Sequence, residues 1–336
     1  MFAQVLLIAH ELGYLTLGNI SLDGSRIHAD ASKSKAVSYG RLLELEARLQ
    51  QEVAELLALG EQTDATELPP GLVIDTEVAF RQERLLNLAQ AKAILEARAA
   101  ERYQVEVAEY EARLRQRAEK AQERGRKPRG PEPKPPQQSG PRAKDQYNFT
   151  DPDSQIMKNS TNGGFDQHYN VQVAVEQENL FVVGNSLSNH PVDTYEAIPT
   201  VDAIPPEVGH PKAAALDKIY FAPQNIQDFE ARQIEPFIAT GREPHHRSWQ
   251  ERFAQTPEPP PDDASPIVKM AYKLQTELGK VVYGLRKSTV EPVIGIIKEV
   301  LGFRQFSLRG LEAAAGEWCL VCLAWNLKRL HKLATT

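Results

Sequence analysis

Two long charge-rich segments most constrain how this chain can fold. Ser38–Leu59 and Asp75–Arg124 carry apolar residues at helical spacing, such as Leu85 and Leu88, in narrow stripes flanked by Glu and Arg. Stripes of this width are typical of paired helices and not of helices buried in a globular core. The pattern predicts an antiparallel helical hairpin or coiled coil over residues 38–124.

A proline-rich basic segment, residues 125–146, follows the helices. It cannot form a core, and we expect it to be an extended or disordered linker. The net charge of the chain is −6, but basic residues are concentrated in two segments. Residues 112–144 contain eleven Lys or Arg and three Glu. The chain from Val281 onward contains eight basic and four acidic residues. This distribution permits a polyanion partner without requiring one, because a basic helix face is also commonly just solvated.

The remaining chain alternates predicted strands and helices. Apolar residues from Ile20 to Ile27 predict a first strand with Asp23 at or near its end, although Asp23–Gly24 is also a common turn dipeptide. Residues 169–175 and 180–183 predict a hairpin, in which Gln167 and Gln172 are polar side chains that could line a site.

A further strand is predicted within Lys212–Phe221 and ends near Asp217, followed by a helix and another strand. The fold class is therefore α/β (mixed α+β). We predict an N-terminal helix and first strand over 1–37, the helical insertion over 38–124, the linker over 125–146 and the rest of the main domain over 147–336.

The stretch from Tyr283 to Lys298, YGLRKSTVEPVIGIIK, predicts an amphipathic helix with Glu291 and Lys298 on one polar line. The two side chains are separated by about 10 Å of helical rise, so they could touch successive points of a phosphate backbone. Alternatively, Ser288 and Glu291 have the spacing of a capping box next to Pro292, in which case Glu291 only satisfies backbone donors.

Several classes of protein are excluded or disfavoured. The two cysteines, Cys319 and Cys322, exclude a disulfide framework and are interpreted as small apolar residues on a helix, where Trp318 and Trp325 are core residues. No apolar run of about 20 residues is present and the N-terminus does not read as a secretory signal, so we expect an intracellular protein without a membrane partner. The adjacent pair at 245–246 is interpreted as surface or DNA-facing loop histidines.

Three carboxylates occur in the order Asp, Asp, Glu, at two predicted strand ends and on a late helix. They are Asp23, Asp217 and Glu291. Hard oxygen ligands of this kind hold two Mg²⁺ ions about 4 Å apart in enzymes that transfer phosphoryl groups, and no protein nucleophile is needed.

The chain resembles the DDE transposases of bacterial insertion sequences, which have an RNase H-like catalytic core. The resemblance rests on LDGSRIHADASKSKAVSYGR around Asp23, on NFTDPDSQIMK with GFDQHYNVQVAVE, on ALDKIYF around Asp217, and on TVEPVIGIIKEVLGFRQFSLRGLEAAAGEWCLVCLAWNLKRL. It implies an RNase H-like mixed sheet flanked by helices, with the helical hairpin inserted after the first strand.

The late motif is similar to the Tyr, Arg, Glu, Lys signature of that family at Tyr283, Arg286, Glu291 and Lys298. By this resemblance Asp23, Asp217 and Glu291 would be catalytic ligands of two Mg²⁺ or Mn²⁺ ions, Arg286 and Lys298 would bind phosphate of the transposon end, and Tyr283 would position DNA nearby. The resemblance further implies a cytoplasmic, nucleoid-associated protein whose partners are DNA and a second copy of the chain.

Three departures limit the resemblance. The helical region that commonly precedes the core is missing, which is the expectation for an N-terminally truncated copy. Ile219 stands where the pattern normally has Gly, which would crowd a tight strand-to-loop passage beside the metals, and four residues separate Arg286 from Glu291, one more than usual. The sequence therefore predicts a transposase that hydrolyses a phosphodiester at the element's end and transfers the 3′-hydroxyl. The alternative is a decayed remnant that only binds DNA or self-associates.

Overall fold

The computed structural model describes residues 1–62, 68–124, 130–136, 139–159, 163–241 and 257–335. The chain divides into two compact units: unit 1 comprises Met1–Ala31 and Asp153–Thr336, and unit 2 comprises Ser32–Pro152. The predicted helical segment and the predicted linker both fall within unit 2. The pair at 245–246, interpreted above as loop histidines, lies outside the described residues.

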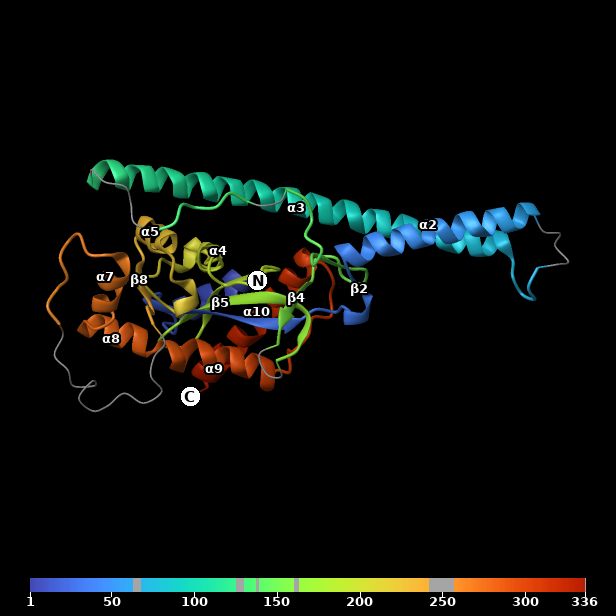
Figure 1. Ribbon diagram of the computed structural model, residues 1–336. Coiled ribbons are helices and arrows are strands. Elements are labelled where there is room, and N and C mark those ends of the chain that lie inside the picture. The colour runs from blue at the N-terminus through green and yellow to red at the C-terminus, as the bar shows by residue number, and fades with distance from the viewer. Residues whose placement is uncertain (63–67, 125–129, 137–138, 160–162, 242–256, 336) are drawn as a thin grey trace. The chain divides into compact units, whose positions relative to one another are not determined.

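Unit 1 is built on one mixed sheet with helices packed on both of its faces (Figure 1). Its strands are β1 (Asn19–His28), β4 (Gln155–Lys158), β5 (Phe165–Glu176), β6 (Val182–Ser188), β7 (Ala213–Leu216) and β8 (Glu235–Ile238). Its helices are α1 (Phe2–Glu11), α4 (Ala197–Asp202), α5 (Pro223–Ala231), α7 (Pro266–Lys273), α8 (Glu277–Gly284), α9 (Arg286–Glu299) and α10 (Leu311–Ala334), with short 3-10 turns η2 (Pro206–Val208) and η3 (Lys218–Tyr220).

Strand β1 is the centre of this sheet. It pairs antiparallel with β5, which also carries β6 and β4, and it pairs parallel with β7, which is followed by β8. This mixed sheet flanked by helices confirms the predicted fold class. The predicted hairpin is also confirmed, since β5 and β6 are joined through residues 177–181.

Strand alternation divides the core of unit 1 into two layers. Ile20 and Leu22 of β1 face one layer, where α1, α4 and α5 also contribute apolar residues. Ile27 of β1 faces the other layer, together with Val171 and Val173 of β5 and residues of α9 and α10. Residues that alternate with Leu22, including Asp23, therefore belong to the face covered by α9.

The first strand differs from its prediction in one respect. β1 runs without interruption through Asp23 and Gly24, which pair with Val173 and Gln172 of β5, so the turn interpretation of this dipeptide is wrong. Asp23 is in the middle of β1 and not at its end. The long antiparallel partner holds the chain extended and overrides the local turn preference.

The C-terminal helix confirms the interpretation of its aromatic residues. Trp318 and Trp325 are buried, and their indole N–H groups donate to the carbonyl oxygens of Gln172 and Leu180. Cys322 is buried in the same layer, whereas Cys319 is only partly buried and both thiols are free. Within the described ranges, no helix is both long enough and apolar enough to span a bilayer.

Unit 2 contains the two long helices predicted from their charge-rich stripes, α2 (Tyr39–Gln62) and α3 (Ile74–Arg124), which are labelled in Figure 1. Their shared core contains Leu42 and Leu49 from α2 with Leu88 and Leu95 from α3. Ion pairs flank this apolar seam, as between Arg81 and Glu52 and between Lys92 and Glu46. The unit also has a 3-10 turn η1 (Lys33–Lys35) and a two-stranded sheet of β2 (Ala36–Ser38) with β3 (Gln146–Asn148).

Candidate active site

Asp23 lies within β1, and Asp217 directly follows β7, the parallel neighbour of β1. The ladder between β1 and β7 pairs Asn19 with Ala213 and ends at Ser21 with Ala215. Each aspartate is two residues beyond that last pair, and the backbone of Asp217 is still extended, so alternation gives both the same facing as Ser21 and Ala215. Both carboxylates therefore belong to the sheet face covered by α8 and α9, whose residues pack there.

Arg286 joins Asp23 to Glu291. Its Nη1 lies 3.1 Å from Oδ2 of Asp23, and its Nη2 lies 3.3 Å from Oε1 of Glu291. The Arg286 side chain is only 6% exposed, while those of Asp23 and Glu291 are 25% and 50% exposed. The guanidinium is thus a buried bridge between a central strand and α9, and it brings two of the three predicted carboxylates to one place.

The charged groups of this cluster shift one another's pKa values. Burial raises the pKa of Asp23 from 3.8 to about 6, and the negative charges of Asp217 and Glu291 add to the rise. The Arg286 guanidinium and the Gly24 N–H, which donates to Oδ1 of Asp23 at 2.9 Å, work in the opposite direction. Burial opposes the charge of Arg286, but the surrounding carboxylates, Asp23 foremost, still raise its pKa.

Lys298 lies farther along β1 on the same helix as Glu291. Its Nζ donates to Oγ of Ser25 at 2.5 Å and to the carbonyl oxygen of Arg26 at 3.2 Å, and burial lowers its pKa. Lys298 therefore contacts β1 two residues beyond Asp23, the partner of Arg286. Tyr283 is near the end of α8 and packs against the cluster of Ala213, Ala215, Phe237 and Val282.

Glu291 is not part of a helix cap. Helix α9 begins at Arg286, directly after α8, and Pro292 is inside the helix. The Ser288 hydroxyl donates to the carbonyl oxygen of Leu285, and the Glu291 carboxylate pairs with Arg286. The capping-box interpretation is therefore wrong, because the helix begins two residues before the residue that would have been its cap.

A buried polar contact fixes how α9 lies on β1. The Thr289 hydroxyl donates to Oγ of Ser21 at 2.7 Å, and Nε2 of Gln177 donates to the same oxygen at 2.9 Å and to the carbonyl oxygen of Val282 at 2.9 Å. Ser21 and Thr289 each precede a predicted ligand by two residues. None of these three polar residues was predicted to be functional from the sequence. The signal that could have identified them is Ser21, a polar residue within an apolar strand.

Ile219 does not crowd the passage after Asp217. It lies in η3, its side chain is 43% exposed, and it is not among the residues with positive φ. The backbone at this position therefore does not require glycine, and the steric conflict expected from the sequence is absent here.

Asp23 and Glu291 approach each other through the Arg286 guanidinium. Over the ranges that the structure describes, no three His, Cys, Asp or Glu side chains form a group that could hold a metal ion. The physical reason is Arg286, whose guanidinium lies between Asp23 and Glu291. The donor chemistry fits a hard divalent cation, since carboxylate oxygens are the ligands that such ions prefer and the Glu291 side chain is half exposed.

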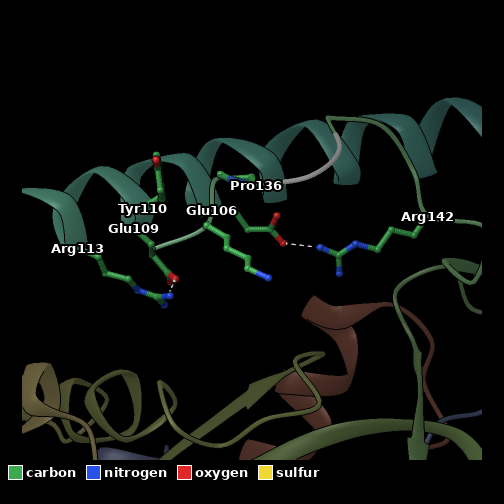
Figure 2. A pocket seen from close by; sticks show the side chains of 7 residues that line it. Glu106, Glu109, Tyr110, Arg113, Pro136 and Arg142 are labelled. Atoms are coloured by element: carbon green, nitrogen blue, oxygen red, sulfur yellow. Dashed lines mark hydrogen bonds and ion pairs between the residues drawn. The ribbon is translucent and has the colours of Figure 1, made fainter. Parts of the chain in front are cut away.

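One cavity of about 440 Å³ is found elsewhere, within unit 2. Figure 2 shows that it lies beside α3 and mixes both signs of charge, with ion pairs between Arg142 and Glu106 and between Arg113 and Glu109. None of the predicted site residues lines it.

Residues 264–331, which include α7, α8, α9 and most of α10, match the family described as a transposase DDE domain. This segment is similar to the DDE domain of transposases. Glu291, Arg286, Lys298 and Tyr283 lie inside it, whereas both aspartates lie outside. Neither a curated protein nor a solved structure matches the chain significantly. The family supports a transposase-type function in general, with DNA as the partner and divalent cations as the usual cofactor.

Proposed function

We propose that this protein is a DNA transposase that hydrolyses a phosphodiester at the ends of an insertion sequence and transfers the freed 3′-hydroxyl to target DNA. The observation that carries the proposal is the bridge from Asp23 through Arg286 to Glu291, with Asp217 directly after the adjacent strand β7. The family match supports it, because the same segment supplies Glu291 and the basic residues around it.

Asp23, Asp217 and Glu291 would hold two Mg²⁺ or Mn²⁺ ions. When bound, such ions activate the attacking oxygen and stabilise the leaving oxygen of an in-line displacement. In the protein itself, the Arg286 guanidinium balances the buried negative charge of Asp23 and carries a positive charge to a place where a DNA phosphate could approach. Lys298, held by β1 beyond Asp23, would contact a second phosphate along the strand.

Tyr283 would position the DNA near Arg286, because it is close enough to that guanidinium to influence its pKa. Strand transfer joins two element ends in one event, so we further propose that two copies of the chain act together. Light scattering of the purified protein with and without DNA ends tests this proposal, and a monomer under both conditions contradicts it.

A second candidate is a DNA-binding remnant without catalytic activity. It is favoured by one observation, the Arg286 guanidinium that separates Asp23 from Glu291. A buried Arg with two carboxylate partners is a stable arrangement by itself and needs no metal ion.

DNA cleavage distinguishes the two candidates. A labelled fragment carrying the element's end is incubated with Mg²⁺ or Mn²⁺ and with wild-type protein, Glu291→Gln or Glu299→Gln. The last variant is the matched control, because Glu299 is on the same helix, is 64% exposed and pairs only with Arg304 among the contacts described. The proposal expects cleavage by the wild type and by Glu299→Gln but not by Glu291→Gln.

Equal cleavage by all three proteins would remove Glu291 from the mechanism. Retained DNA binding with no cleavage by any of them, with either metal, would favour the remnant.

A further inference from the structure

Asp23 and Asp217 both lie beyond the backbone ladder that β1 shares with β7. The last parallel pair is Ser21 with Ala215, two residues before each aspartate. Beyond that pair the separation of the two carboxylates depends on side chains. On the face covered by α9, Asp23 is held by Arg286. A DNA phosphate would compete for this guanidinium, and a divalent cation would compete with it for the carboxylate.

The opposite face carries a ring of buried hydrogen bonds behind the two segments that contain Asp23 and Asp217. The Tyr220 hydroxyl donates to Oε1 of Gln172 at 2.5 Å, and Nε2 of Gln172 donates to Oδ1 of Asp193 at 3.0 Å. Nδ2 of Asn225 donates to the carbonyl oxygens of Tyr220 at 2.8 Å and Thr194 at 2.6 Å. Since Asp193 and Thr194 are adjacent in the chain, these bonds close a ring.

The ring holds the turn that follows Asp217 at three points. Tyr220 contributes both its hydroxyl and its carbonyl oxygen, and the Thr194 hydroxyl donates to the carbonyl oxygen of Ile219 at 2.8 Å. The N–H of Tyr220 in turn donates to the carbonyl oxygen of Asp217 at 3.1 Å. The backbone of Asp217 is therefore tied to the ring through the turn η3.

The ring also contacts the backbone next to Asp23. Gly24 pairs with Gln172 across β1 and β5, and a Cβ atom placed on Gly24 would lie 2.1 Å from Nε2 of Gln172. Gly24 adopts no positive φ, so the glycine is required here by the close approach of the amide and not by backbone conformation. The Gly24 N–H donates to Oδ1 of Asp23, which completes the connection.

The three side chains at the centre of the ring are almost fully buried: Gln172, Tyr220 and Asn225 are 1%, 0% and 2% exposed. Burial raises the pKa of Tyr220 well above its ordinary value, so its hydroxyl remains a neutral donor. Fully satisfied buried networks of this kind are rigid, because each broken bond leaves an unpaired polar group.

We infer that Gln172 and Tyr220 are positioning residues that set the separation of Asp23 and Asp217 from the face opposite the reaction. The inference rests on the proposed function, in which these carboxylates hold metal ions. Gln172 acts on Asp23 through its contact with Gly24 of β1. Tyr220 acts on Asp217 through the turn η3. Neither residue would touch the metal ions or DNA.

Mn²⁺ binding tests the inference without depending on cleavage. Calorimetric titration of the full-length protein with Mn²⁺ is performed for wild type, Tyr220→Phe and Gln172→Leu. Residues that position metal ligands usually change metal affinity by about 10- to 100-fold when removed. We expect Mn²⁺ affinity to fall by that factor in both variants, with unfolding curves that show a folded protein.

Thr200→Val is the matched control. Thr200 is 0% exposed, is on the same side of the sheet, and bonds to Ser186 and to the carbonyl oxygen of Glu196 without joining the ring. Thr200→Val should lose as much stability as Tyr220→Phe but keep wild-type Mn²⁺ affinity.

A second pair of variants tests the contact at Gly24. Gly24→Ala should weaken Mn²⁺ binding by displacing Gln172. Gly316→Ala is its control, because the added Cβ meets no atom within 4 Å.

Wild-type Mn²⁺ affinity in Tyr220→Phe and Gln172→Leu would overturn the inference and leave the proposed function intact. Equal weakening in Thr200→Val would also overturn it, because the effect would then follow general stability. A wild-type protein that does not bind Mn²⁺ would overturn both proposals.

Discussion

Replacing Asp23 with asparagine should stabilise the metal-free protein at neutral pH. The carboxylate of Asp23 is buried beside two other carboxylates, and its pKa is raised from 3.8 to about 6. A carboxyl group with a raised pKa in the folded state favours folding while it is protonated and loses that contribution as pH rises through the folded pKa. An asparagine side chain at this position would keep the shape of the aspartate without the cost of the buried charge.

The size of the stabilisation follows from the raised pKa of Asp23. A rise from 3.8 to about 6 corresponds to about 3 kcal/mol at 1.36 kcal/mol per pKa unit, and this value is an upper bound. This shift already includes the attraction of Arg286, which lowers the pKa, and the 25% exposure of the Asp23 side chain lets water screen part of the cost. We therefore expect a stabilisation of about 1–3 kcal/mol above pH 6. This stabilisation should shrink between pH 6 and 4. It should vanish below pH 4, where the aspartic acid of the wild type and the asparagine of the variant are both neutral.

The assay is denaturant unfolding in the presence of EDTA from pH 4 to 8, followed by fluorescence of Trp318 and Trp325, which are buried in unit 1. Glu299→Gln is the control, because that carboxylate is 64% exposed and should show no comparable gain. An Asp23→Asn protein that is no more stable than wild type at pH 7.5, or whose advantage does not depend on pH, refutes the reasoning.

Three further predictions concern single contacts. Thr289→Val should destabilise unit 1 by about 1–2 kcal/mol in denaturant unfolding, because the buried Ser21 hydroxyl loses one of its two donors and keeps only Gln177, while Ser288→Ala should change stability by less than about 0.5 kcal/mol. Lys298→Met should lower DNA affinity and reduce the slope of log affinity against log salt by about one, measured by fluorescence anisotropy. Leu88→Ala should lower the unfolding free energy of unit 2 by about 2–5 kcal/mol, because Leu88 is buried between α2 and α3.

The features that could be predicted from the sequence are those set by local periodicity. The narrow stripes of α2 and α3 and the alternation of Tyr169 to Val175 each identify an element because the pattern repeats over many residues. The order Asp23, Asp217, Glu291 also indicated the candidate site, since predicted strand ends and a late helix carry these residues.

The features that could not be predicted depend on partners distant in the chain. Asp23–Gly24 reads locally as a turn, but pairing with β5 makes it the middle of a strand. Pro292 reads as a helix start, but α9 begins six residues earlier, at Arg286. The bridge by Arg286 joins residues 263 positions apart in the chain, and no spacing rule predicts it.

The position of bound Mn²⁺ tests the central claim most directly. Crystals of the protein soaked in Mn²⁺ should show anomalous scattering between Asp23 and Asp217, with the Glu291 side chain turned toward it and away from Arg286. Crystals of Asp217→Asn should lose this signal. Anomalous density elsewhere on the protein, or an unchanged Arg286 bridge at saturating Mn²⁺, would contradict the claim that these three carboxylates form a metal-dependent active site.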